Sequence, residues 1–224
     1  MNLINKSIVI LISGGLDSST VIGLAKNKGA LIYGLSFDYG QRHKKELIAA
    51  KKIASHFSIQ ELKTIQLDLT LWGGSSLTDT REEIPRDGIQ LNKIPNTYVP
   101  GRNTIFIATA LSYAEAINAD FIGLGVNSLD YSGYPDCRPD YINQFQKLAN
   151  LSNKRGRENH PIRLWTPLIN LNKIEILELA SENNVPIEET WSCYSGKVTP
   201  CGECDSCRIR EKALKEWINK HKKK

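Results

Sequence analysis

The feature that most constrains the fold is an apolar segment near the N-terminus that leads directly into a glycine turn. Residues 7–12, SIVILI, form a continuous apolar run of mostly branched residues, and the turn LISGGLDSST overlaps the end of this run. Runs of this kind are typical of parallel strands that are covered on both faces. We therefore expect a buried parallel strand here, followed by a helix over residues 19–27.

Further strand and helix patterns alternate along the chain. The predicted strands are 30–37 (ALIYGLSF), 61–67 and 120–126 (DFIGLGV), and the predicted helices are 43–57, 103–118, 140–149, 172–183 and 206–221. Parallel strands need crossover connections, which place helices on both faces of the sheet. The pattern predicts an α/β fold with a doubly wound parallel sheet.

Two segments lack a helix or strand pattern. Residues 70–100 contain the breakers Gly73, Gly74, Pro85, Gly88, Pro95 and Pro100, and residues 127–139 form a polar, aromatic stretch after the fourth predicted strand. Long irregular segments inside a compact domain are usually functional. We expect residues 70–100 to pass over the edge of an active site or to form a partner surface.

Length and charge exclude several classes of protein. The 224 residues suffice for one hydrophobic core, and the net charge of +5 is concentrated in the last five residues, four of which are lysines. With a nearly neutral body, we expect no stable nucleic-acid partner. No apolar run reaches about 18 residues and no cleavage-type site follows the first strand, so we expect a cytoplasmic protein with no membrane association.

The glycine turn has the composition of a phosphate site. Gly14 and Gly15 allow close backbone approach, Ser13, Ser18 and Ser19 offer hydroxyls, and the following helix presents unpaired N–H groups. Asp17 would repel phosphate unless Mg²⁺ bridges the two. The structural alternative is that Asp17 and Ser18 cap the helix and the glycines turn the chain.

Four of the five cysteines are close together near the C-terminus, at Cys193, Cys201, Cys204 and Cys207. Four thiolates can surround one Zn²⁺ and leave no open position, so we expect a structural zinc site that fastens the last helix to the body. The run Cys201, Cys204 and Cys207 also fits the spacing of iron–sulfur ligands, although no proline follows the last cysteine. Cysteines without metal are the third alternative.

The segment SGGLDS resembles the pyrophosphate loop of the PP-loop ATPases, and no GKS or GKT follows it as in a Walker loop. The resemblance implies an ATP-binding domain of the adenine nucleotide alpha hydrolase-like type over residues 1–185, with residues 186–224 as a zinc-binding helical segment packed on it. It also implies Mg²⁺ as a cofactor. The implied ATP-binding residues are Ile12, Ser13, Gly14, Gly15, Leu16, Asp17, Ser18, Ser19, Thr20, Val21 and Ile22.

Three more motifs indicate which family of PP-loop enzymes the chain resembles. They are DYGQRH at residues 38–43, VPGRN at 99–103 and DYSGYPDCRP at 130–139. With SGGLDS and the cysteine pattern, they resemble the 7-cyano-7-deazaguanine synthases over residues 8–214. The resemblance implies an ATP-dependent ligase of queuosine biosynthesis that converts 7-carboxy-7-deazaguanine and ammonium into the nitrile, acts on small molecules and forms a homodimer. Because the chain shows no glutamine-hydrolysing domain, free ammonium is the expected nitrogen source.

The same resemblance suggests roles for individual residues. Asp17, Arg102 and Lys173 are the expected catalytic residues. Arg102 is either an oxyanion clamp or part of a surface ion pair, and Lys173 either reaches a phosphate from the start of its helix or is solvated. The expected substrate-binding residues are Asp130, Tyr131, Tyr134, Asp136 and Arg138. His43 is either a proton shuttle or structural, Cys137 is either reactive or a small buried filler, and Gln41 and Arg42 are expected to line the site.

Two other functions compete with this interpretation. A PP-loop enzyme that thiolates or amidates tRNA would use the same phosphate loop, but it would need an RNA-binding surface. A zinc-ribbon binding module without catalysis would leave the SGGLDS loop unexplained. Binding of ATP would distinguish the enzymes from the zinc-ribbon module. Retention of tRNA would distinguish the tRNA-modifying enzyme from the other two.

Overall fold

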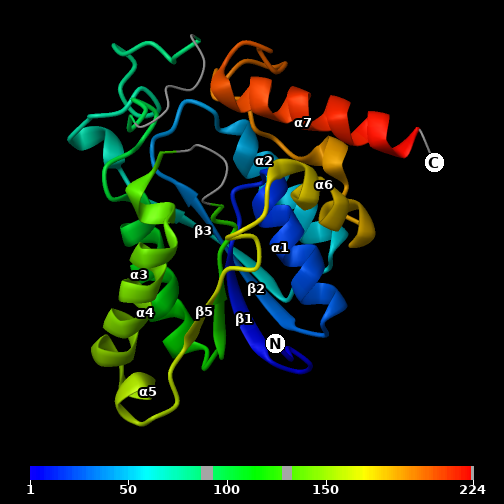
Figure 1. Ribbon diagram of the computed structural model, residues 1–224. Coiled ribbons are helices and arrows are strands. Elements are labelled where there is room, and N and C mark those ends of the chain that lie inside the picture. The colour runs from blue at the N-terminus through cyan, green and yellow to red at the C-terminus, as the bar shows by residue number, and fades with distance from the viewer. Residues whose placement is uncertain (87–92, 128–132, 223–224) are drawn as a thin grey trace.

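The computed structural model describes residues 1–86, 93–127 and 133–222, which form a parallel five-stranded sheet between two layers of helices (Figure 1). The strands have the spatial order β3-β2-β1-β4-β5, and each neighbouring pair is parallel. Their bounds are β1 Ser7–Leu11, β2 Leu31–Asp38, β3 Glu61–Gln66, β4 Phe121–Gly123 and β5 Arg163–Trp165. The predicted doubly wound α/β fold is confirmed.

Each face of the sheet has its own hydrophobic core. One core includes apolar residues of α1 Leu16–Asn27, α2 Lys45–His56, α6 Lys173–Glu182 and α7 Asp205–His221. The other includes residues of α3 Arg102–Ala116 and α4 Pro139–Ser152. The remaining helical pieces are α5 Lys154–Arg157 and the 3₁₀ turns η1 Leu69–Leu71, η2 Pro135–Cys137 and η3 Ile187–Glu189.

The sequence prediction differs from the structure at short elements. It missed β5 and α5, which have only 3 and 4 residues and give too few positions for a periodic pattern. Helix α1 begins at Leu16, three residues before the predicted start, so Asp17 and Ser18 lie in its first turn. None of the helices in the described part of the chain is long and apolar enough to span a bilayer.

The order of the strands fixes where a ligand can bind. The chain runs outward from β1 to β3 on one side and then continues with β4 and β5 on the other, so the direction reverses between β1 and β4. In open α/β sheets, ligands bind beyond the carboxyl ends of the strands at such a reversal. The SGGLDS turn follows β1 and lies at this position.

Gly14 is required by packing. Its φ of +79° is left-handed, and a Cβ there would lie 2.6 Å from the backbone nitrogen of Ala50 and even closer to the carbonyl oxygen of Glu46, both in α2. These backbone atoms cannot move away without distorting α2. The glycine therefore permits the close approach of α2 to the turn.

Gly14→Ala is therefore expected to lower the free energy of unfolding by about 3 kcal/mol, from left-handed strain and overpacking together. Gly15→Ala is the matched control, because Gly15 has a φ of −81° and the atom nearest to an added Cβ would be Ser13 Oγ at 3.3 Å. Urea unfolding checks both variants. Equal losses of stability in the two variants would contradict the packing argument.

Candidate active site

A cavity of about 560 Å³ lies at the carboxyl ends of β1, β2 and β4. The turn after β1, the residues after β4, and the first turns of α3, α6 and α7 contribute to its wall. Pro85 and residues 93–97 also line it, so part of the irregular 70–100 segment does border the cavity, as expected. The segment is held partly by Arg42, whose guanidinium donates hydrogen bonds to the carbonyl oxygens of Asp79 and Glu82.

The SGGLDS turn presents an open helix N-terminus to this cavity. Gly15 is the N-cap of α1, and no side chain caps the first turn. Ser13, Gly15, Asp17 and Ser18 line the cavity, and the hydroxyls of Ser13 and Ser18 lie 3.1 Å apart. Uncapped N–H groups at a helix N-terminus bind phosphate oxygens readily. The geometry suits the phosphates of a nucleotide.

Several of the residues expected around ATP face away from the cavity. Ser19 and Thr20 are fully buried, and their hydroxyls donate to the carbonyl oxygens of Gly15 and Leu16 at 2.8 Å. Val21 and Ile22 belong to the hydrophobic core. Within the expected segment, the cavity is lined by Ile12, Ser13, Gly15, Leu16, Asp17 and Ser18.

Asp17 and Lys173 form an ion pair across the cavity wall. The Lys173 ammonium lies 3.0 Å from Asp17 Oδ1 and 2.9 Å from Oδ2. Lys173 is the first residue of α6, and a capping box between Asn172 and Glu175 closes the N-terminus of this helix. The structure thus brings two predicted catalytic residues together, from helices that are far apart in the sequence.

Arg102 is the third predicted catalytic residue, and aromatic rings surround it. Its guanidinium donates to Tyr39 Oη at 3.1 Å and lies 5.6 to 5.9 Å from the ring centres of Tyr39, Phe106 and Tyr134. No carboxylate of the described residues lies within ion-pair distance of it. Burial raises the pKa of Tyr39 far above its usual value, so this hydroxyl stays neutral. A cation in such surroundings attracts an anionic ligand.

The predicted substrate-binding residues have different locations. Tyr134 lines the cavity, where its hydroxyl donates to Thr97 Oγ1 at 2.9 Å. Asp136 accepts a hydrogen bond from the Asn103 backbone N–H at 3.0 Å, so it caps α3, and burial raises its pKa. Arg138 is exposed and does not line the cavity. Asp130 and Tyr131 lie outside the described residues.

The motif DYGQRH contributes in ways that the sequence did not indicate. Gln41 is buried and does not line the cavity, but it donates to Glu46 Oε1 at 2.9 Å. His43 and Glu46 do line it, and His43 Nε2 lies 3.1 Å from Glu46 Oε2. Cys137 is a buried cavity residue that accepts from Asn103 Nδ2 at 3.1 Å.

Sequence reasoning missed the contribution of the C-terminal segment to the cavity. Trp191, Tyr194 and Arg210 all line it. The Trp191 backbone N–H donates to the Gly14 carbonyl oxygen at 2.9 Å, and Arg210 donates to Thr190 Oγ1 at 2.7 Å. The sequence pattern predicted the helix α7, but it did not indicate which other elements this helix would contact.

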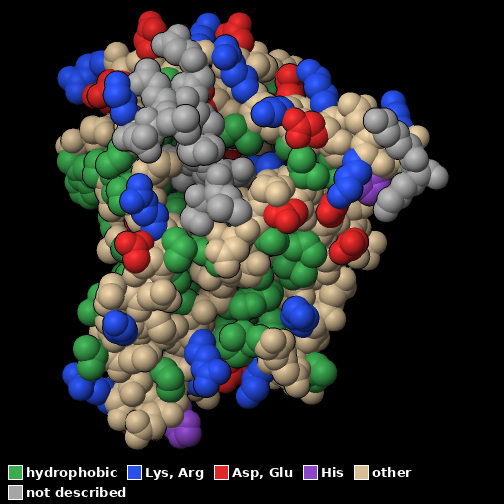
Figure 2. Space-filling view, in the orientation of Figure 1, with side chains coloured by type: hydrophobic (Ala, Val, Ile, Leu, Met, Phe, Trp, Pro, Cys, Tyr) green, Lys and Arg blue, Asp and Glu red, His purple; other side chains and the backbone are tan. Residues whose placement is uncertain are grey.

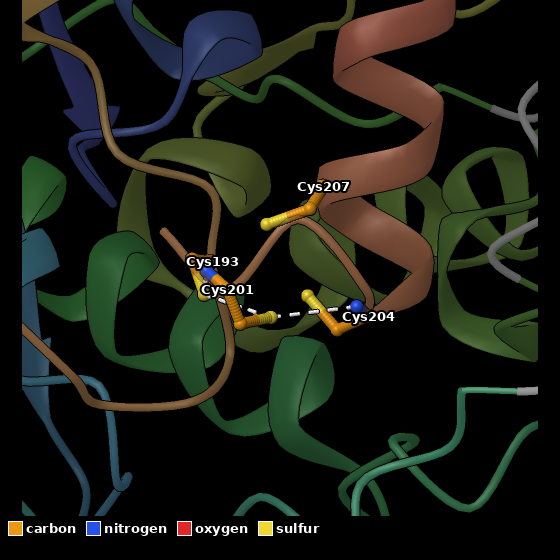
Figure 3. Close-up of side chains that lie close together, drawn as sticks. All are labelled: Cys193, Cys201, Cys204 and Cys207. Atoms are coloured by element: carbon orange, nitrogen blue, oxygen red, sulfur yellow. Dashed lines mark hydrogen bonds between the residues drawn. The ribbon is translucent and has the colours of Figure 1, made fainter. Parts of the chain in front are cut away.

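The four cysteines converge on one point beside the cavity (Figure 3). Their sulfur atoms all lie within 4.8 Å of one another, and Cys193, Cys204 and Cys207 are buried. Burial raises the pKa of the Cys201 thiol, but backbone N–H groups of Cys204 and Glu203 outweigh it and lower the pKa to about 6. The donor set is suited to one metal ion. Cys204 is the N-cap of α7, so a bound ion would fix the start of that helix.

Charged side chains of both signs lie near α7 on the face of the molecule drawn in Figure 2. In the upper part of Figure 2, Lys and Arg side chains are interspersed with Asp and Glu side chains. Some of these opposite charges form ion pairs between different parts of the chain, for example Lys220 with Glu178 and Arg86 with Glu203. Non-specific nucleic-acid binding depends on clustered positive charge.

Comparison with solved structures supports the fold. An NMN synthetase from Francisella tularensis superimposes with a TM-score of 0.51, over 98% of this chain and 87% of the other, at 17% sequence identity. At this identity the likeness concerns the fold alone. It agrees with the predicted parallel α/β fold.

Comparison of sequences identifies the family. A 7-cyano-7-deazaguanine synthase from Prochlorococcus marinus strain MIT 9312 is 71% identical over 224 residues, which is 100% of both chains. One from strain MIT 9515 is 73% identical over 217 residues, which is 97% of both chains. The family model described as queuosine biosynthesis protein QueC matches residues 7–218. The chain therefore belongs to the QueC family of queuosine biosynthesis proteins.

Proposed function

We propose that this protein is an ATP-dependent synthase that converts 7-carboxy-7-deazaguanine and ammonium into 7-cyano-7-deazaguanine. The observation that carries the proposal is one cavity that contains both an uncapped helix N-terminus and a partly buried guanidinium with aromatic neighbours. Near-full-length relatives with more than two thirds identical residues bear the name of this activity.

The phosphate loop would hold ATP. Ser13, Ser18 and the uncapped start of α1 border the cavity in which the phosphates would lie. Asp17 offers carboxylate oxygens, the ligands that Mg²⁺ prefers, and Lys173 could then move from Asp17 to a phosphate oxygen. Bound Mg²⁺ would neutralise charge on the phosphates.

Arg102 would hold the carboxylate of the substrate. Its planar fork suits two oxygens, and the rings of Tyr134 and Phe106 are placed to contact a flat heterocycle bound next to it. ATP then converts a carboxylate oxygen into a leaving group, ammonia displaces it to give an amide, and a second activation removes the amide oxygen as the nitrile forms. Both activations use the same phosphate loop.

The four cysteines would hold a structural Zn²⁺. Four sulfurs bound about 2.3 Å from one zinc lie about 3.8 Å apart, which small rotations of the side chains can reach from the observed cluster. Such an ion fixes α7, whose residues Ile209 and Arg210 line the cavity. We propose that residues 1–185 are the nucleotide-binding part and residues 186–224 the metal-binding part of one unit. We also propose that the protein is a cytoplasmic homodimer without a nucleic-acid partner.

Cys201→Ser is expected to abolish stoichiometric metal binding and to lower the urea midpoint of unfolding, because three thiolates remain. Cys137→Ala is the matched control, since Cys137 lies outside the cluster and is buried like most of its members. Elemental analysis should find one zinc per chain in the wild type and in Cys137→Ala. Iron with a visible absorption band in the wild type would contradict the zinc assignment.

The proposed activity is tested by incubating the purified protein with Mg-ATP and ammonium plus either 7-carboxy-7-deazaguanine or unmodified tRNA. Mass spectrometry should detect the nitrile in the first reaction and no change in the second. ATP-dependent modification of the tRNA, without nitrile in the first reaction, would replace this proposal with a tRNA-modifying function.

A further inference from the structure

Arg210 in α7 is partly buried and lines the cavity, but it has no role in the steps above. Its Nη1 donates to Thr190 Oγ1 at 2.7 Å and to Ser192 Oγ at 3.3 Å, and its Nη2 donates to the Ile187 carbonyl oxygen at 2.7 Å. Three acceptors from one short segment suit the planar fork of a guanidinium. Arg210 therefore fixes residues 187–192 against α7.

The same segment is bonded to the phosphate loop. Trp191 lies between the two residues whose hydroxyls accept from Arg210, and its backbone N–H donates to the Gly14 carbonyl oxygen at 2.9 Å. The Trp191 indole N–H donates to the carbonyl oxygen of Cys193 at 2.9 Å, which holds the side chain as well. Trp191 therefore connects the C-terminal segment with the turn after β1.

The bond from Trp191 also sets the orientation of a peptide group in the phosphate loop. A trans peptide is planar, so its C=O and N–H groups point in opposite directions. Because the Gly14 carbonyl oxygen points to Trp191, the Gly15 N–H points the other way, and it donates to Ser13 Oγ at 3.2 Å. Gly15 is the N-cap of α1, and both Gly15 and Ser13 line the cavity. The direction of this N–H donor thus depends on the bond from Trp191.

Two residues of the cysteine cluster belong to the same loop and helix. Cys193 directly follows the segment that Arg210 holds, and Cys207 lies three residues before Arg210 in α7 (Figure 3). An ion held by the cluster would fasten the same two parts of the chain. Loss of the Arg210 guanidinium alone would then leave the loop attached, and the expected effect is a small displacement of the phosphate loop without unfolding.

We propose that Arg210 is a positioning residue for the nucleotide site, an inference that rests on the binding of ATP in the proposed function. Its guanidinium holds residues 187–192, and the Trp191 N–H within this segment orients the peptide between Gly14 and Gly15. Arg210 thereby raises the affinity for the phosphates of ATP without touching them. The segment that contains the cysteine cluster is in this way a part of the ATP site.

The experiment measures the binding of a non-hydrolysable ATP analogue with Mg²⁺ to Arg210→Gln by calorimetry. The affinity should fall by about 10- to 30-fold, near the lower end of what hydrogen bonds from a charged donor contribute, because the effect is indirect. In steady-state kinetics, the KM for ATP should rise in parallel, whereas the KM for 7-carboxy-7-deazaguanine should stay within about twofold of the wild type. Arg210→Lys should recover only part of the affinity, because an ammonium lacks the fork.

Thr190→Val tests the route of the effect. Valine keeps the shape of threonine but removes the hydroxyl that accepts from Arg210 at 2.7 Å. The affinity for the ATP analogue should fall by about threefold. The double variant of Thr190→Val and Arg210→Gln should bind the analogue no more weakly than Arg210→Gln alone, because both substitutions break the same contact.

Arg208→Gln is the matched control, because Arg208 is an exposed arginine of the same helix that does not line the cavity. Thermal unfolding without ligand and elemental analysis monitor the fold and the metal content of each variant. If Arg210→Gln does not fold, the same selective loss is required of Arg210→Lys and Thr190→Val.

Equal rises in the KM for ATP and for the acid, or an unchanged affinity for the ATP analogue, would overturn the role of Arg210. A wild-type protein that binds no ATP would overturn the proposed function, and this inference with it. A wild-type protein that binds ATP but forms no nitrile would overturn the proposed function alone, and the binding measurements would still decide the role of Arg210.

Discussion

Asp17→Asn is expected to lower the rate of nitrile formation by about 10³-fold, the largest effect of any variant considered. The substitution keeps the size of the side chain but removes the charge that pairs with Lys173 and that would bind Mg²⁺. A group that stabilises charge at a reacting centre typically raises the rate by about 10²- to 10³-fold. Asp17→Asn would disturb two such groups, Lys173 and the bound Mg²⁺. Steady-state kinetics at several Mg²⁺ concentrations measures the effect, which raised Mg²⁺ should relieve only in part.

Asp120→Asn provides a matched control for this variant. Asp120 also pairs with basic side chains, Lys6 at 3.9 Å and Arg155 at 3.5 Å, but it immediately precedes β4, at the amino end of the sheet and outside the cavity. The activity of the Asp120→Asn variant should stay within about twofold of that of the wild type. An Asp17→Asn enzyme with near-normal activity would contradict the assignment of the phosphate site to the start of α1.

Arg102→Gln is expected to lower kcat/KM for the carboxylate substrate by about 10²- to 10³-fold, which corresponds to about 3 to 4 kcal/mol. The Arg102 guanidinium is partly buried among aromatic rings and donates a hydrogen bond to Tyr39 Oη. The KM for ATP should change little. Arg102→Lys should recover only part of the activity, because an ammonium lacks the planar fork.

The amide intermediate gives this prediction a sharper test. The amide carries no negative charge, so the Arg102→Gln enzyme should convert the synthetic amide into nitrile with a much smaller loss than it shows with the acid. Equal losses for the acid and the amide, or a comparable rise in the KM for ATP, would show that Arg102 does not hold the carboxylate.

Local sequence patterns predicted the parts of the fold that local physics determines. The apolar runs of β1 and β2 and the helical periodicity of α3 matched the structure within a few residues. The convergence of the four cysteines also agrees with their spacing. These features depend on short stretches of chain, where neighbouring residues decide the conformation.

Features that depend on distant contacts could not be predicted in this way. Ser19 and Thr20 have the residue types of phosphate ligands, but their hydroxyls bond back to the helix because the tertiary packing of α1 buries them. Asp136 has the appearance of a substrate contact, yet it caps α3. The roles of Glu46 and Arg210 in the cavity depend on the packing of α2 and α7, which no local pattern determines.

The most direct test of the central claim is a reaction with ¹⁵N-labelled ammonium, Mg-ATP and 7-carboxy-7-deazaguanine, with Asp17→Ala as the control. The account predicts a nitrile product that is heavier than the product from unlabelled ammonium by the mass difference between one ¹⁵N and one ¹⁴N atom. The wild type should form it with consumption of ATP, and the control should not form it. Consumption of ATP without a labelled product, in protein that retains its metal, would contradict the claim that this cavity converts the acid and ammonia into the nitrile.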